Sequence, residues 1–175
     1  MPQTLDQAMI DRAAFIGLGA NLANPRDMIR NALRRLGEAE GLTFLAASSI
    51  YLTEPQGGPP GQDWYHNAVA LFDCRLSPEA LLERLLALEA DMGRVRLELN
   101  GPRVIDLDLL AFGREVIDMP PKLLVPHPRL AQRVFVLAPL AEVAPGWRHP
   151  VLGRTASELL AALPPDGQGF KRLEA

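Results

Sequence analysis

Hydrophobic and polar positions along the chain follow two periods, which predict alternating strands and helices. Apolar runs of strand length, rich in β-branched and aliphatic residues, occur at residues 13–18, 42–51, 67–72 and 104–112. Between them, apolar residues recur at helical spacing over residues 25–37 and 78–92. The predicted order is therefore strand–helix–strand–strand–helix–strand, with the second strand extending toward Thr53.

Helix start and stop residues support both predicted helices. Asn24 before Pro25, and Ser77 before Pro78, are typical of a helix N-cap followed by its first helical position. Gly93 comes directly after the last apolar residue of the second helix, where a C-terminal glycine is favoured.

This order predicts an α+β fold, a ferredoxin-like βαββαβ sandwich with a mostly antiparallel sheet and helices packed on one face. The 175 residues suffice for one core and rarely for two, and no repeat or domain-scale linker divides them. We therefore assign residues 1–175 to a single domain and expect flexible ends at residues 1–11 and 165–175.

Beyond residue 112, shorter elements are predicted. Gly113 turns the chain toward a short hairpin at Val116, and the prolines near residues 123–128 favour an extended segment. A helix is expected at residues 129–144, with Pro139 as a kink or break, and an amphipathic stretch at 155–163.

The strand at residues 104–112 carries the strongest candidate chemistry. Side chains alternate across a strand, so one of its faces is apolar throughout, with Ile105, Leu107, Leu109 and Ala111. Asp106 and Asp108 share the other face, about 7 Å apart. Two carboxylates on one face repel each other and resist desolvation, so a cation is expected between them, either Arg103 or a hard divalent metal. On spacing alone, two acids on a solvated strand face remain an alternative.

Charge and composition narrow the functional classes. The net charge of −3 argues against a general nucleic-acid binder, which needs a basic surplus. Arg94, Arg96 and Arg103 precede the two aspartates, a cluster that suits a metal–polyphosphate site. Salt bridges between these arginines and the aspartates are the alternative that needs no ligand.

Other site classes find little support in the sequence. Cys74 is the one cysteine, and the three histidines lack zinc-ligand spacing. Gly17 and Gly19 imitate the start of a dinucleotide fingerprint, but Leu22 occupies the third glycine position, and no Gly-Lys dipeptide of a P-loop occurs. No apolar run approaches membrane-spanning length, so a cytoplasmic protein is expected.

A binding surface for a planar ligand is suggested near the third strand. Tyr65 and Asn67 are two residues apart and share a face, so an aromatic ring lies beside an amide. The Pro- and Gly-rich segment 54–62 before them is expected to be a surface loop over a site. A structural tyrosine and a turn asparagine are the plainer reading. Glu89, at the edge of a helix stripe, either reaches water or has a role.

These residues belong to a set of motifs by which the chain resembles the 6-hydroxymethyl-7,8-dihydropterin pyrophosphokinase family (2-amino-4-hydroxy-6-hydroxymethyldihydropteridine diphosphokinase). In the family's order, the motifs are F-I-G-L-G-A-N-L at 15–22, S-S-I-Y-L-T-E-P at 48–55, Y-H-N-A-V at 65–69, G-R-V-R at 93–96, G-P-R-V-I-D-L-D-L-L at 101–110, V-P-H-P at 125–128 and R-V-F-V-L-A-P-L at 133–140. They cover residues 13–145.

The resemblance implies a reaction and a site. The family transfers pyrophosphate from ATP to the 6-hydroxymethyl group of its pterin in folate biosynthesis and releases AMP. Asp106 and Asp108 match the pair that holds two Mg²⁺ ions, and the catalytic set adds Arg94 and Arg103. Pterin-site positions are matched by Thr53, Gln56, Tyr65, Asn67 and Phe135. Nucleotide-site positions are matched by Glu89, Arg94, Arg96, Arg103, Lys122, His127 and Arg133.

The sequence also departs from the family, and alternatives stay open. Leu99 and Asn100 stand where some members carry Arg-Trp, so the lid arginine and tryptophan have no counterpart. Glu54 and Gln56 likewise differ from residues found in other members. One alternative is another metal-dependent phosphoryl- or nucleotidyl-transferase. Another is a ferredoxin-like RNA-binding module, although this sequence lacks the aromatic pattern expected of one. ATP and the pterin are the expected partners of a monomer, without nucleic acid or membrane.

Overall fold

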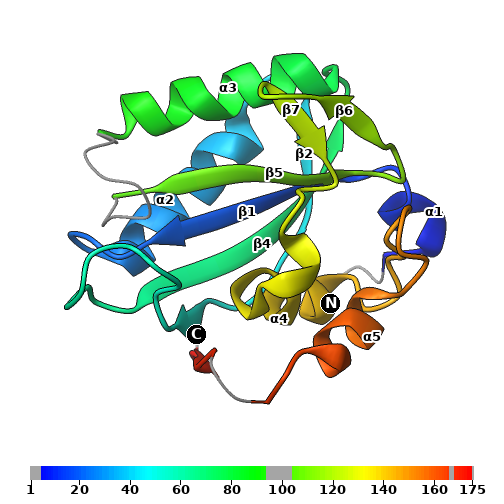
Figure 1. Cartoon of the computed structure of the whole chain (residues 1–175). Coiled ribbons are helices and arrows are strands. Elements are labelled where there is room, and N and C mark those ends of the chain that lie inside the picture. Colours follow the sequence, from blue (N-terminus) through cyan, green and yellow to red (C-terminus); the bar gives the residue numbers. More distant parts are fainter. Residues whose placement is uncertain (1–4, 94–103, 166–167, 175) are drawn as a thin grey trace.

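The computed structural model describes residues 5–93, 104–165 and 168–174, and its main elements follow the predicted order (Figure 1). Five of the six strands of the main sheet, and two helices, are β1 (Ala14–Ala20), α2 (Pro25–Glu38), β2 (Leu42–Ala47), β3 (Tyr51–Thr53), β4 (Tyr65–Cys74), α3 (Pro78–Asp91) and β5 (Asp106–Phe112), and the sixth strand is β8 (Phe170–Arg172) near the C-terminus. Shorter elements are α1 (Gln7–Ile10), β6 (Ile117–Met119), β7 (Leu123–Val125), the 3₁₀ helix η1 (Leu130–Gln132), α4 (Val134–Val143) and α5 (Ala156–Ala162).

The sheet has the order β5-β1-β4-β3-β8, and β2 also pairs with β4. Every neighbouring pair in it is antiparallel. The predicted strand from residue 42 toward Thr53 forms two successive strands along β4, β2 and β3, which are separated by residues 48–50. The α+β ferredoxin-like class is confirmed, and β6 and β7 form a separate hairpin.

Helices cover the sheet on both faces (Figure 1). On one face, α2 and α3 pack buried side chains such as Ile29 and Leu81 against Ile16. On the other, α4 and α5 form a second core in which Leu137 packs with Phe15. This second layer adds to the predicted arrangement, in which helices cover one face. Helix α4 is apolar on nearly all sides because it lies between the sheet and α5.

The helix predicted at residues 129–144 is interrupted, but not at the predicted residue. Pro139 lies inside α4, and the helix continues through it. The break falls at Arg133, whose extended backbone (φ −117°, ψ 112°) separates η1 from α4. Packing on both sides of α4 stabilises the helix despite the N–H that proline lacks. The break at Arg133 turns the chain where the candidate site begins.

Strand β5 contains a bulge that changes its predicted faces. Phe15 of β1 pairs with Ala111, but the next residue, Ile16, pairs with Leu109, so Leu110 has no opposite partner. Leu109 therefore belongs to the core under α2 and α3, whereas Ala111 belongs to the core under α4. The prediction that Ala111 shares a face with Leu109 is wrong, because the extra residue shifts the alternation. The alternation holds for the part of the strand that carries Asp106.

Near both chain ends, described residues form hydrogen-bonded elements that the sequence pattern does not predict. Near the N-terminus, the Asp6 carboxylate accepts a hydrogen bond from Met9 N at 2.8 Å and caps α1. Near the C-terminus, β8 pairs with β3, and all three of its side chains are exposed. Because β8 buries no side chain, its sequence has no alternating pattern from which a strand is predicted. In the described parts of the chain, we find no helix with the length and apolar character needed to span a membrane.

Candidate active site

A pocket lies over the C-terminal end of β1 and the N-terminal ends of β4 and β5. It contains about 540 Å³ of empty space, including space open to solvent. Described residues that line it are Gly19, Thr53, Glu54, Gln56, Tyr65, Asn67, Asp106, Asp108, Arg133 and Phe135. All five residues predicted for the pterin, and both predicted metal ligands, are in this set.

Sheet register explains why these residues meet. Gly19 on β1 pairs with Asn67 of β4 on one side and with Asp106 of β5 on the other. Thr53 reaches the same end because β3 pairs with β4, placing it opposite Tyr65. Residues 12 to 87 positions apart in sequence are thus brought together within three antiparallel strand pairs.

Gly19 is a site residue that the sequence analysis missed. A Cβ at this position would lie 2.8 Å from the Asn67 Oδ1 atom, so a larger residue would displace the amide. Gly17, two residues earlier, faces the Leu110 side chain in the same way. Glycine inside a strand often marks close approach of a ligand or another group, and that signal was available in the sequence.

The proposed pterin side of the pocket is held by side-chain hydrogen bonds. The buried Asn67 amide donates from Nδ2 to Thr53 Oγ1 at 2.5 Å. The Tyr65 hydroxyl donates to Gln62 Oε1 at 3.0 Å, and Asn21 Nδ2 donates to the same oxygen at 3.3 Å. The aromatic ring and the amide are therefore fixed before any ligand binds, which reduces the entropy lost on binding.

Arg133 and Phe135 enter the pocket from the start of α4. The Arg133 guanidinium carbon lies 5.2 Å from the centre of the Phe135 ring, a cation–π contact. Arg133 has extended backbone, and Phe135 follows in the first turn of the helix. The two side chains thus combine an aromatic surface with a positive charge beside the aspartates.

Asp106 and Asp108 line the pocket from β5, and both are half-buried. Their partners on β1 are glycines, because Gly19 pairs with Asp106 and Gly17 with Asp108. Both carboxylates border the open space of the pocket. Two carboxylates beside open space suit Mg²⁺, which is commonly bound by one or two carboxylates together with substrate phosphates and water. The described residues contain no group of three His, Cys, Asp or Glu able to hold a metal.

Of the described residues predicted for the nucleotide site, Arg133 lines the pocket, whereas Glu89, Lys122 and His127 do not. Glu89 is 3% exposed on α3, and its Oε1 accepts a hydrogen bond from Leu107 N at 2.7 Å. It therefore anchors β5 between the two aspartates, a role that its place on the helix stripe did not reveal. Lys122 is exposed, with Nζ 3.8 Å from Glu83 Oε1. Arg94, Arg96 and Arg103 lie outside the described residues, as does the Leu99–Asn100 departure.

His127 lies close to the charged groups of the pocket. Burial, together with the Arg133 and Arg129 guanidinium groups, lowers its pKa to about 4, whereas Asp106 acts in the opposite direction. Its Nδ1 accepts a hydrogen bond from Arg129 N at 3.2 Å. At neutral pH the imidazole is therefore neutral, and it can bind a ligand through a hydrogen bond but not as a cation.

This pKa predicts a pH dependence of stability. The ordinary histidine pKa is 6.5, so the unfolded chain binds the proton more readily than the folded chain. The contribution of neutral His127 is complete above pH 6.5 and declines as pH falls toward 4. Measured by urea unfolding, the free energy of unfolding of His127→Gln should fall by about 1–3 kcal/mol less than that of wild type as the pH is lowered through this window. Equal losses for the two proteins would contradict the assignment.

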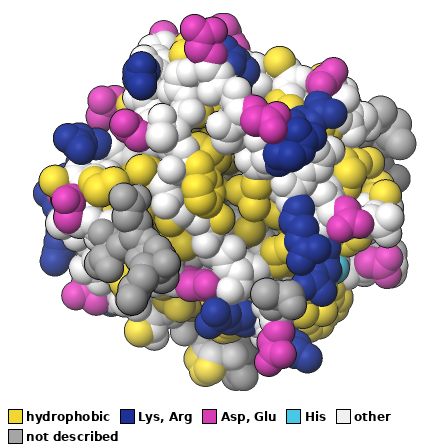
Figure 2. Space-filling view, turned by 180° about the vertical axis from the view of Figure 1, so that it is seen from behind, with side chains coloured by type: hydrophobic (Ala, Val, Ile, Leu, Met, Phe, Trp, Pro, Cys, Tyr) yellow, Lys and Arg dark blue, Asp and Glu magenta, His cyan; other side chains and the backbone are white. Residues whose placement is uncertain are grey.

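Fold and site together define a class of protein. A pocket at the strand ends of an α+β sandwich, with an acidic pair, an arginine and two aromatic rings, is typical of an enzyme that acts on small charged and planar substrates. On the face shown in Figure 2, acidic side chains lie among the basic ones.

Comparison with known proteins identifies the family within this class. The chain belongs to the family described as 7,8-dihydro-6-hydroxymethylpterin-pyrophosphokinase (HPPK), whose model matches residues 15–145. It is 44% identical over 159 residues to a 2-amino-4-hydroxy-6-hydroxymethyldihydropteridine pyrophosphokinase of Pseudomonas aeruginosa, covering 91% of this chain and 96% of the relative. The protein of the same name from Methylorubrum extorquens is 43% identical over 155 residues, covering 88% and 95%. The resemblance inferred from the sequence is confirmed.

A solved structure supports the fold. The crystal structure of wild-type Plasmodium falciparum HPPK-DHPS with pteroate matches with a TM-score of 0.68 at 16% identity. The match covers 85% of this chain and 42% of that one, so this chain spans less than half of the fused protein. At this identity the likeness shows the fold. The family itself consists of ATP-dependent pyrophosphokinases of folate synthesis.

Proposed function

We propose that this protein transfers the pyrophosphoryl group of ATP to the hydroxymethyl oxygen of 6-hydroxymethyl-7,8-dihydropterin and releases AMP. The observation that carries the proposal is one pocket in which an aromatic and amide surface lies beside an acidic pair. A planar acceptor and a polyphosphate donor can then be held next to each other. For phosphoryl transfer, alignment and charge neutralisation contribute more than covalent catalysis.

The pterin would bind between the rings of Tyr65 and Phe135. Both rings line the pocket from different elements, β4 and the start of α4. Asn67 and Thr53, hydrogen-bonded to each other at the base of the pocket, would bind the polar edge of the ring. Gln56 lies on the adjacent loop, where its Nε2 donates to Glu54 O at 3.1 Å.

The phosphates would lie on the opposite side of Gly19, next to the acidic pair. We propose that Asp106 and Asp108 hold two Mg²⁺ ions. When bound, Mg²⁺ supplies positive charge for the phosphate oxygens and lowers the pKa of a coordinated alcohol. Arg133 adds a positive charge at the pocket wall, and neutral His127 offers a hydrogen bond. Arg94, Arg96 and Arg103 remain predicted phosphate contacts.

Glu89 and Lys122 have different relations to the proposed nucleotide site. Through its bond to Leu107 N, Glu89 would act on the site by fixing β5 rather than by touching the nucleotide. A nucleotide contact of Lys122 remains a prediction, because its exposed side chain lies beside Glu83.

We also propose that residues 1–175 act as one domain and as a monomer in the cytoplasm. The described residues that line the pocket come from β1, β3, β4, β5, the loop before β4 and the start of α4, which supports a single domain. The cytoplasm is where ATP is available to such an enzyme.

The reaction itself is the direct test. Protein, Mg²⁺, ATP and 6-hydroxymethyl-7,8-dihydropterin are incubated together, and nucleotides and pterins are separated by chromatography. We expect AMP to appear in step with pterin pyrophosphate and only when the pterin is present. ADP as the product would favour a different phosphoryl transferase, and AMP formation without pterin would mean that the acceptor is wrong.

Tyr65 tests the pterin side separately. Removing the ring in Tyr65→Ala should weaken pterin binding about 10- to 100-fold, because stacking on an aromatic side chain contributes about 1–3 kcal/mol for a nucleic-acid base of similar character. ATP binding should change less than about twofold. The matched variant Tyr65→Phe keeps the ring and loses the hydrogen bond to Gln62. Calorimetric titration with each substrate checks this, and equal loss for ATP and pterin would contradict the stacking role.

A further inference from the structure

The backbone on either side of Arg133 depends on a residue near the C-terminus. Because η1 ends and α4 begins at this residue, the carbonyl of Gln132 and the N–H of Val134 fall at the junction of two helices. The Gln168 side chain contacts both groups. Its Oε1 accepts from Val134 N at 2.9 Å, and its Nε2 donates to Gln132 O at 3.0 Å. One amide thus bridges the break that points Arg133 toward the pocket.

The segment around Gln168 is itself fixed to the edge of the site. Gly169 exchanges two contacts with Glu54, a pocket residue: Glu54 N donates to Gly169 O at 2.9 Å, and Glu54 Oε2 accepts from Gly169 N at 3.1 Å. A Cβ on Gly169 would lie 2.8 Å from the Trp64 ring, so the segment passes directly under that side chain. Beyond it, Leu173 N donates to Ile50 O at 2.8 Å.

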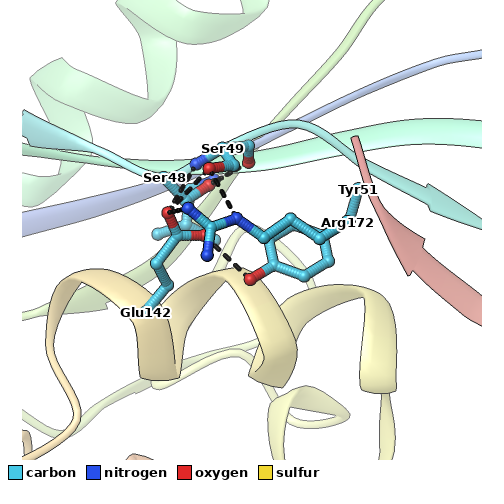
Figure 3. A network of polar contacts seen from close by, with 6 residues as sticks. Ser48, Ser49, Tyr51, Glu142 and Arg172 are labelled. Carbon is cyan, nitrogen blue, oxygen red and sulfur yellow. Dashed lines mark hydrogen bonds and ion pairs between the residues drawn. The ribbon is translucent and has the colours of Figure 1, made fainter. Parts of the chain in front are cut away.

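A polar network ties the same segment to α4 (Figure 3). Arg172 donates from Nε to Ser49 Oγ at 3.0 Å, and its Nη2 lies 3.5 Å from Glu142 Oε1. The Tyr51 hydroxyl donates to Glu142 Oε2 at 2.8 Å. Burial, together with this hydrogen bond, raises the pKa of Tyr51 to about 12, so the phenol keeps its proton. The C-terminal strand, β3 and α4 are therefore held in one arrangement at neutral pH.

We propose that Gln168 is a positioning residue for pyrophosphoryl transfer, acting through the backbone of Arg133. The inference rests on the proposed function, and it concerns a residue beyond the 15–145 range of the family match. Gln168 is not among the described residues that line the pocket, so its effect would be indirect. By fixing both peptide groups that flank Arg133, it holds the guanidinium over Phe135 and beside the aspartates. Without the bridge, Arg133 would sample other directions, and alignment would be lost.

The test compares Gln168→Met with Lys171→Met. Methionine keeps the length of glutamine but makes neither hydrogen bond, and Lys171 is an exposed residue of the same C-terminal segment. We expect Gln168→Met to lower kcat/KM for the pterin about tenfold or more, measured well below the melting temperature. We expect Lys171→Met to stay within about twofold of wild type.

A double-mutant cycle separates positioning from a merely structural role. Once Arg133 is replaced by Ala, Gln168→Met should lower kcat/KM no further, because the side chain that it positions is gone. The same factor lost in both backgrounds would overturn the inference, and so would wild-type kcat/KM for Gln168→Met.

A second variant covers the case in which Gln168→Met does not fold. Gln168→Glu keeps an acceptor for Val134 N and loses the donor to Gln132 O. We expect it to lose kcat/KM in the wild-type background and not in Arg133→Ala. Equal losses in both backgrounds, or no loss in wild type, would overturn the inference. If wild-type protein forms no pterin-dependent AMP, the proposed function is overturned and this inference with it. If wild-type protein forms AMP normally, the Gln168 variants test this inference alone.

Discussion

Asp106→Asn and Asp108→Asn should each lower kcat about 1,000-fold or more while the protein stays folded. Both carboxylates line the pocket, and each faces a glycine of β1 rather than a side chain. Asparagine keeps the shape of aspartate but removes the charge that a metal–phosphate site requires, and charge stabilisation of this kind contributes several kcal/mol to the transition state. Steady-state rates of AMP formation at saturating ATP and pterin measure the loss.

The matched control is Asp118→Asn. Asp118 also lies on a strand, β6, but it is exposed and does not line the pocket. We expect its kcat to remain within about twofold of wild type. Far-ultraviolet circular dichroism of all three variants establishes folding. Wild-type kcat in either pocket variant would refute the assignment of the acidic pair as metal ligands.

Gly19→Ala should lower kcat/KM for the pterin about 100-fold. The added Cβ would lie 2.8 Å from Asn67 Oδ1, so the amide must move from its place against Thr53. Displacing a substrate-binding group by about 1 Å is enough to cost about two orders of magnitude. Steady-state rates of AMP formation at varied pterin concentration measure the loss in kcat/KM. ATP binding without pterin should change much less, because Asn67 lies on the other side of β1 from the acidic pair.

Gly37→Ala provides the same chemical change where the structure has room. Gly37 lies in α2, and no heavy atom lies within 4 Å of where a Cβ would be. Alanine should leave the kinetics unchanged and stabilise the helix by about 0.4–1 kcal/mol. If Gly19→Ala behaved like Gly37→Ala, the pocket would have enough freedom to accept the methyl group, and the tight fit at Asn67 would not be needed.

Hydrophobic periodicity was sufficient to predict the strands in which buried and exposed residues alternate and the helices in which buried residues recur every three or four positions. Helices α2 and α3 begin at their predicted prolines, and Ser77 caps α3 by accepting a hydrogen bond from Ala80 N. Asp106 and Asp108 share a pocket because a period of two places them on one face of β5. These features depend on interactions within one element, and a sequence records such interactions directly.

Other features depend on pairing between distant segments, which periodicity does not record. The bulge at Leu110 is a property of two strands together, so it is invisible in either one. Glu89 looked like an edge residue of a helix, and its role appeared only when Leu107 N was found beside it. The sequence analysis placed the break in this helix at Pro139, because proline is a strong local signal. The break lies at Arg133 instead, and the side chain that hydrogen-bonds the backbone on both sides of it belongs to Gln168, 35 residues later. The motif resemblance supplied the site residues that spacing alone left open.

The pairing of Gly19 with Asn67 on one side and Asp106 on the other has a consequence for how the two substrates are aligned. Neighbouring strands are about 4.8 Å apart, so the acceptor side and the donor side of the pocket are separated by two strand spacings, about 10 Å. That separation is set by the peptide hydrogen bonds of the sheet and does not depend on any side chain. The backbone of β1, which lies between β4 and β5, therefore sets the distance between the two sides of the pocket. Substitutions of side chains around the pocket should leave the spacing between the Asn67 and Asp106 backbones unchanged, provided that the three strands keep their register.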